Sequence, residues 1–189
     1  MLFDFVDVSF VNKKFSLIPN EYFTSKELLP QFKLSNHLFK SEFLRFNVLP
    51  NLSHSVLVFN YDENIEYYLM NKFENVRIIH SGVRSISNFK SNNEEYVQLV
   101  LHKSDIEILA YKKGALQLYT IEDYSSYDDI LYHVINIKNQ LDMTNESRVV
   151  LLGNHPQIFN IANHLIKNKV SAKLGFQDNK ENALFALIN

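Results

Sequence analysis

The alternation of apolar and polar residues divides the first half of the chain into short strands and one short helix. Residues 6–10 alternate strictly, which predicts a half-buried strand, and residues 15–18 predict a second strand. The spacing of Thr24 and Glu27 predicts a capping box at the start of a helix. Residues 36–52 are apolar without a regular period, so we interpret them as an extended arm or a hairpin.

The pattern becomes clearer after residue 54. Residues 55–59 form a continuous apolar run, typical of a strand that is covered on both faces. Asp62 is placed to cap a helix. The apolar stripe of that helix comprises Ile65, Tyr68, Leu69 and Phe73. A strand at residues 76–79 and a short helix at residues 82–90 follow. Residues 91–95 are the most linker-like stretch, which places a domain boundary there.

The second half begins with three apolar segments separated by tight turns, which predict an antiparallel meander of strands. These segments are residues 96–102, 106–111 and 115–121. Ser126 then caps an amphipathic helix, and a strand follows at residues 148–152. Pro156 is expected at the first position of the next helix. A short strand at residues 170–174 and a helix from about Lys180 complete the pattern.

The order of elements is similar in the two halves. The strand at Ser55, its helix and the strand at Val76 are matched by the strand at Val149, its helix and the strand at Val170. Few residues are identical between the halves. The pattern therefore predicts a repeat of architecture rather than of sequence.

Composition excludes several classes of protein. The 189 residues are 46% hydrophobic and 21% charged, which is typical of a globular protein with a real core. A net charge of −2 gives no electrostatic support for nucleic acid as a partner. The absence of cysteine excludes disulfides and thiolate chemistry. We find neither a signal peptide nor a membrane span in the sequence, so we expect a cytoplasmic protein.

Few residues carry recognisable chemistry. The seven histidines show no spacing typical of a metal site, and four glycines cannot build a glycine-rich phosphate loop, so no metal is predicted. Two turns remain as candidate cleft or anion-binding sites. Their residues are His102, Lys103 and Ser104 in the first, and Gly153, Asn154 and His155 in the second. The alternative is an ordinary solvated turn in the first case and helix capping in the second.

Three segments together resemble a known family. Residues 99–108 with residues 114–116 resemble the second phosphate-loop hairpin of the actin, Hsp70 and sugar-kinase superfamily, and residues 149–154 resemble its adenosine-loop strand. Residues 15–23 add to a likeness with an uncharacterised bacterial family of actin-like ATPase fold, similar to pilus-assembly ATPases. The resemblance implies an α/β, ribonuclease H-like fold with duplicated β-β-β-α-β-α-β-α subdomains. These would be an incomplete first subdomain at residues 1–92 and a second at residues 93–189.

The departures from this family imply lost catalysis. The aspartate of its Asp-x-Gly phosphate turn falls on Val100 and the glycine on His102, while Asn154 takes the place of a second glycine. The phosphate-loop hairpin of the first subdomain is also missing, so we expect either that the chain starts late and has lost this segment or that the sequence is truncated. The resemblance then implies a pseudoenzyme without a cofactor and without ATP hydrolysis.

Two functions therefore remain open. The first is a non-catalytic binding or scaffold module, whose partner is another protein or a second copy at an open sheet edge, unless a loop such as residues 36–52 covers that edge. The second is a nucleotide- or phosphometabolite-binding enzyme with a non-standard site around His102, Lys103 and Gly153. Neither expectation involves nucleic acid or a membrane span.

Overall fold

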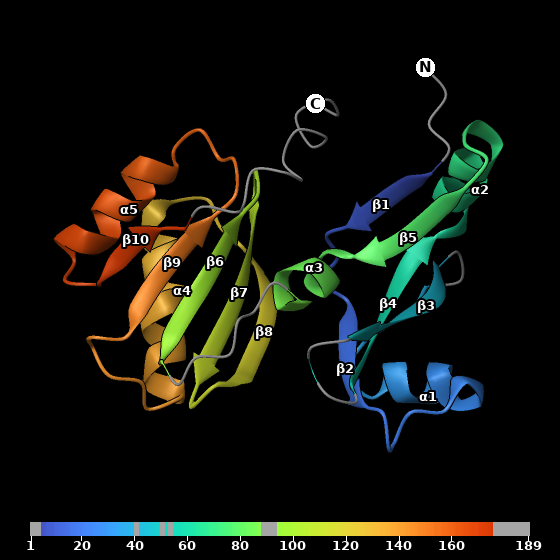
Figure 1. The fold of residues 1–189 in the computed structure, drawn as a ribbon, viewed down its shortest axis with the longest axis horizontal. Helices are drawn as coiled ribbons and strands as arrows, with labels where there is room; N and C mark the ends of the chain where they lie inside the picture. The colour runs from blue at the N-terminus through green and yellow to red at the C-terminus, as the bar shows by residue number, and fades with distance from the viewer. Residues whose placement is uncertain (1–4, 40–41, 50–51, 53–54, 88–93, 176–189) are drawn as a thin grey trace. The chain divides into compact units, whose positions relative to one another are not determined.

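The computed structural model describes residues 5–39, 42–49, 52, 55–87 and 94–175. The chain divides into two compact units, residues 1–90 and residues 91–189. Each unit contains strands and helices (Figure 1). The predicted α/β class is confirmed.

The second unit is built on a mixed five-stranded sheet with the order β10-β9-β6-β7-β8. Its strands are β6 (Tyr96–Leu101), β7 (Asp105–Lys112), β8 (Ala115–Asp123), β9 (Arg148–Leu152) and β10 (Ala172–Leu174). The first three pair antiparallel, so the predicted meander is confirmed. The strands β9 and β10 add to the other side in parallel. The last strand begins two residues later than predicted, because Val170 closes the turn that ends the preceding helix.

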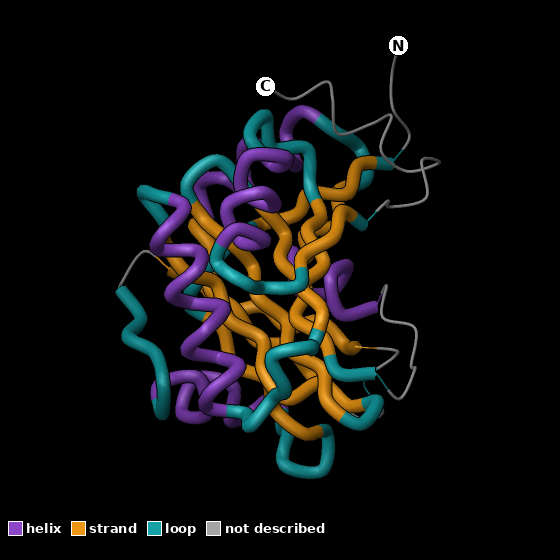
Figure 2. Tube along the Cα trace, turned by 90° about the vertical axis from the view of Figure 1, so that its left-hand side faces the viewer, coloured by secondary structure: helices purple, strands orange, loops and turns teal. Residues whose placement is uncertain are grey.

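Two helices cover one face of this sheet, α4 (Tyr127–Gln140) and α5 (Ile158–Lys167) (Figure 2). Ser126 begins α4 in a complete capping box with Asp129. Between sheet and helices lies a core of fully buried side chains, which includes Val97, Leu99, Ile106, Ile108, Ile130, Val134, Val149, Leu151, Ile161 and Leu165. The helix predicted at Lys180 lies outside the described residues.

The start of α5 differs from the prediction at Pro156. The helix begins at Ile158, after a turn in which the Ile158 N–H donates to the His155 carbonyl. His155 Nδ1 accepts from the Gln157 N–H at 3.2 Å. Pro156 therefore lies in the turn rather than at the first helical position.

The first unit contains two small sheets. In one, β1 (Val6–Phe10) pairs in parallel with β5 (Val76–His80), and in the other β4 (Ser55–Asp62) lies between β2 (Phe15–Pro19) and β3 (Glu42–Leu49). The helices are η1 (Ser25–Glu27), α1 (Leu28–Lys33), α2 (Glu63–Lys72) and α3 (Ser81–Ser87). Residues 42–49 therefore pair with β4 and do not cover β1.

This topology corrects the predicted repeat. The strand at Ser55 was expected to correspond to β9, but it pairs antiparallel on both sides within its own sheet. Both β6 with β9 and β1 with β5 are parallel neighbours that antiparallel strands and a helix separate in sequence, so β6 and β9 correspond to β1 and β5. The strands β2, β3 and β4 lie between them in sequence. Apolar continuity alone cannot distinguish the two arrangements, because β4 is buried on both faces as a parallel strand would be.

His80 at the end of β5 connects the two small sheets of this unit. Its imidazole is fully buried and lies 5.1 Å from the Phe15 ring and 5.4 Å from the Phe59 ring, measured between ring centroids. Nδ1 accepts from the Gly82 N–H at 3.0 Å, so the proton is on Nε2, which donates to the Asn12 carbonyl at 2.8 Å. This histidine is accordingly neutral and structural.

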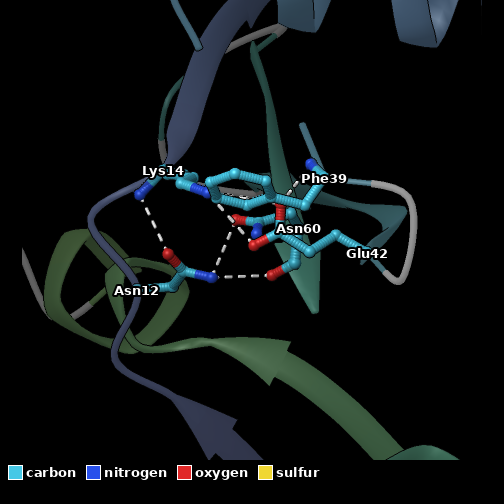
Figure 3. A network of polar contacts seen from close by, with 5 residues as sticks. All are labelled: Asn12, Lys14, Phe39, Glu42 and Asn60. Carbon is cyan, nitrogen blue, oxygen red and sulfur yellow. Dashed lines mark hydrogen bonds and ion pairs between the residues drawn. The ribbon is translucent and has the colours of Figure 1, made fainter. Parts of the chain in front are cut away.

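A second polar network ties the loop after β1 to the three-stranded sheet (Figure 3). The Asn12 amide donates at 2.8 Å to both the carbonyl and the side-chain oxygen of Asn60. Lys14 Nζ lies 3.1 Å from Glu42 Oε1, and the Phe39 N–H donates to Glu42 Oε2 at 2.8 Å. Burial alone raises the pKa of Glu42, but these hydrogen bonds and the lysine hold it below its usual value.

Two further predictions are wrong in this unit. Thr24 makes no capping bond to a backbone N–H, because its hydroxyl donates to the Glu27 carboxylate instead. The predicted stripe of α2 is only partly buried: 42% of Ile65 and 55% of Tyr68 is exposed, whereas the other two residues of the stripe are half-buried.

Candidate functional site

The two turns singled out from the sequence lie at the same end of the five-stranded sheet. The strands β6 and β9 run parallel, with Val100 opposite Leu152, so residues 102–104 and 153–155 follow neighbouring carboxyl ends. Ligands of open α/β sheets generally bind at such ends.

Gly153 brings the turns into direct contact. Its φ of +109° suits glycine, and a Cβ placed there would lie 2.7 Å from the Leu101 carbonyl oxygen. Tyr124 also bridges the turns. Its hydroxyl donates to the His102 carbonyl at 2.6 Å, and its ring lies edge-on to the His155 ring at 6.2 Å between centroids. Burial first, and then the charge of Asp105, raises the pKa of Tyr124, so it remains a hydrogen-bond donor at neutral pH.

The central feature of the site is a buried carboxylate. Glu107 is 1% exposed, and one of its oxygens lies 2.7 Å from His102 Nε2. The other oxygen accepts from the Tyr119 hydroxyl at 2.9 Å. A carboxylate in this position fixes the orientation of the imidazole.

Glu107 also lies directly opposite Val100 in the pairing of β6 with β7. Val100 occupies the place where the resemblance expects the metal-binding aspartate. A carboxylate is therefore present next to that place, but on the neighbouring strand and already bonded by both oxygens to protein side chains. Such a group is not free to hold a hydrated cation.

The other predicted residues lie at the surface. Lys103, Ser104, Gly153 and Asn154 are exposed, whereas His102 and His155 are half-buried. The Ser104 hydroxyl donates to Asp105. Lys103 is the one lysine or arginine among the predicted residues. His155 accepts a hydrogen bond within the turn before α5, but α5 has no side-chain capping bond, so His155 does not cap that helix.

No cluster of metal-ligating side chains lies at these turns in the part of the chain that the structure describes. Its His, Asp and Glu side chains form no group of three that could hold a metal ion. An open cavity of about 320 Å³ lies elsewhere and is lined by Glu94, Glu95, Thr144, Glu146, Ser147 and Arg148. Three of these six residues are acidic, which does not favour an anion.

Sequence reasoning missed Glu107, Tyr119 and Tyr124. A signal for Glu107 was available, because it is the one charged residue between Asp105 and Lys112 in an otherwise apolar strand. A charge inside such a run is buried only when it has partners. The two tyrosines carry no comparable signal, because aromatic residues are common throughout the chain.

The fold is that of the actin-like ATPases. A protein of unknown function with an actin-like ATPase fold from Bacteroides thetaiotaomicron VPI-5482 aligns with a TM-score of 0.78 at 20% identity, over 90% of this chain and 68% of its own. The PilM-PilN type IV pilus biogenesis complex aligns with a TM-score of 0.54 at 12% identity, over 91% of this chain and 69% of the other. At these identities the likeness defines the fold alone.

The sequence places the chain in one family within this class. Residues 2–168 match the family described as Protein of unknown function (DUF3822), and the chain belongs to that family. The predicted resemblance to an uncharacterised family of actin-like fold is confirmed. No curated protein matches the sequence. Among the described residues, no helix has both the length and the apolar character needed to cross a membrane.

Proposed function

We propose that this chain is a non-catalytic protein of actin-like fold that acts as a binding or scaffold module. The observation that carries the proposal is the state of the hairpin between β6 and β7. Val100 and His102 stand where the resemblance expects Asp and Gly, and Glu107 is bonded on both oxygens. Phosphoryl transfer needs a carboxylate or comparable group that is free to hold the metal, and close backbone approach to phosphate.

A neighbour in fold space supports a role in protein assembly. PilM has this fold and is found in a complex with PilN. By analogy, the present chain would use the fold as a platform for another polypeptide rather than for chemistry. The first unit would then be an incomplete actin-like subdomain, residues 1–92, beside a complete second one, residues 93–189.

Thermal unfolding with ATP, ADP and Mg²⁺ tests this proposal. A ligand present at about a hundred times its dissociation constant stabilises the folded state by about 2.7 kcal/mol, which raises the midpoint of a chain of this size by several degrees. We expect no shift with either nucleotide. A reproducible shift would overturn the non-catalytic reading.

A second candidate function is binding of a nucleotide or phosphometabolite at the two turns. It is favoured by their position at the carboxyl ends of β6 and β9, with His102 and Lys103 close to Gly153. If a nucleotide shifts the midpoint, the variant Lys103→Ala distinguishes the cases. Loss of the shift would place the ligand at these turns, whereas Lys113→Ala, in the turn between β7 and β8, should leave the shift unchanged.

A further inference from the structure

The outer edge of β1 has no paired strand within the part of the chain that the structure describes. In the second unit, β6 has a strand on each side, β9 and β7. Its counterpart β1 pairs only with β5 among the residues described here. An edge of this kind exposes main-chain N–H and C=O groups to any strand that can reach them.

The pairing of β1 with β5 identifies these groups. The Val6 N–H donates to the Asn75 carbonyl at 2.8 Å, so Val6, Val8 and Phe10 direct their main-chain groups toward β5. Because successive residues of a strand point to opposite sides, Asp7 and Ser9 direct theirs outward. No described residue bonds to these four groups.

We propose that β1 pairs antiparallel with β1 of a second copy of this chain. The two-fold axis would run perpendicular to the sheet, with Val8 opposite Val8 of the second copy and Asp7 opposite Ser9. A two-fold axis in this direction keeps the apolar faces of the two copies on one side, and the contact is the same for both. This proposal rests on the proposed binding function and names its partner.

The register follows from hydrogen bonding and from charge. Asp7 opposite Ser9 makes a hydrogen-bonded pair, in which the two residues exchange both main-chain bonds. The symmetric contact repeats this pair and uses all four outward groups. A register centred on Asp7 would place two carboxylates opposite each other, which destabilises a sheet. A register centred on Ser9 would pair Asp7 with Val11, which lies beyond the end of β1.

Side-chain contacts within the same unit fix the position of β1. Asp7 Oδ1 accepts from Arg77 Nε at 2.8 Å, and Arg84 lies 3.5 Å from the other carboxylate oxygen. Beyond the end of the strand, Asn12 is fixed to Asn60 (Figure 3). A strand anchored at both ends loses little conformational freedom on pairing, which favours association. A contact of five residues per copy nevertheless predicts a weak, concentration-dependent dimer.

Sedimentation equilibrium over a wide concentration range, with two variants at Ser9, tests the proposal. Ser9→Asp places a carboxylate opposite Asp7 of the other copy at two symmetric positions, while Ser9→Asn changes the size of the side chain equally without the charge. We expect the unmodified protein and Ser9→Asn to dimerise alike. The dissociation constant of Ser9→Asp should rise roughly three- to thirtyfold, and added salt should reduce that difference.

Hydrogen exchange on the unmodified protein provides a measurement that does not depend on a variant folding. The amides of Asp7 and Ser9 should be protected at high concentration and exchange on dilution. A monomer at every concentration, a dimer equally stable in Ser9→Asp and Ser9→Asn, or amides protected in the monomer would each overturn the proposal. The last result would mean that another part of the same chain covers the edge. None of these outcomes bears on nucleotide binding, so the two proposals fail separately.

Discussion

Glu107 lies directly opposite Val100 in the β6–β7 pair, and its two carboxylate oxygens are bonded to His102 and Tyr119. The place where a metal-binding aspartate is expected is therefore apolar, and the nearest carboxylate is used to hold the hairpin together. This arrangement converts a turn expected to serve phosphate chemistry into a structural element.

Replacement of Glu107 by Gln should destabilise the second unit. The glutamine keeps the shape but loses the charge, and its amide nitrogen cannot accept a hydrogen bond from Tyr119 or His102. Leaving a buried donor unsatisfied costs about 1–3 kcal/mol in the free energy of unfolding, which urea denaturation measures. Glu146→Gln, at an exposed position, is the control and should change stability by no more than about 0.5 kcal/mol. Equal stability of the two variants would show that the network contributes little.

Restoration of the family motif should not create an ATPase. In the double variant Val100→Asp and His102→Gly, the new carboxylate lies opposite Glu107 in a nearly buried position. Two like charges so close should cost about 2–4 kcal/mol of stability at neutral pH, and less in acid, where protonation of either removes the repulsion. A phosphate-release assay with Mg²⁺ and ATP should stay at background. Turnover by this variant would show that the hairpin alone suffices for catalysis.

Much of the second unit could be predicted because its signals are local. Turns of two or three residues connect β6, β7 and β8, so their order along the chain is also their order in the sheet. Ser126 and Asp129 mark the start of α4 within four residues. The candidate turns at His102 and Gly153 could be placed at one end of the sheet for the same reason, since each ends a predicted strand.

The topology of the first unit and the contacts of the candidate site depend on pairings between residues that are distant in sequence. β1 pairs with β5 across about seventy residues, and no local pattern shows that β2, β3 and β4 form a separate sheet between them. The bond between His102 and Glu107 likewise requires the register of two strands, which strand prediction alone does not provide. The capping box expected at Thr24 has the right spacing, but its side chains bond to each other instead.

Asp129 should make the stability of the second unit depend on pH in acid. Hydrogen bonds from the Ser125 and Ser126 N–H groups and the Ser126 side chain hold the pKa of Asp129 below its usual value. A carboxylate with a lowered folded-state pKa stabilises the fold above its unfolded pKa, and this contribution is lost as the pH falls through the folded value. Asp129→Asn should therefore be less stable than the unmodified protein at about pH 7, and the difference should close near pH 2. Urea midpoints at the two pH values measure it, with Glu146→Gln as the control that shows no such change.

Gly153→Ala tests whether the two candidate turns meet as described. The residue has a φ of +109°, where an L side chain is strained, and the new Cβ would lie 2.7 Å from the Leu101 carbonyl oxygen and 3.3 Å from its nitrogen. Leu101 cannot move away easily, because β6 is paired on both sides, with β7 and with β9. The strain and the contact together should lower the free energy of unfolding by about 2–4 kcal/mol.

Gly114→Ala separates backbone strain from the contact with Leu101. Gly114 also has a positive φ, 73°, but it lies in the turn between β7 and β8, where alanine should cost about 1 kcal/mol. Urea denaturation of the two variants should therefore show a clearly larger loss for Gly153→Ala, because only that residue faces the backbone of β6. If both losses are equal, Gly153 does not approach Leu101 closely, and the turns of His102 and His155 do not form one site.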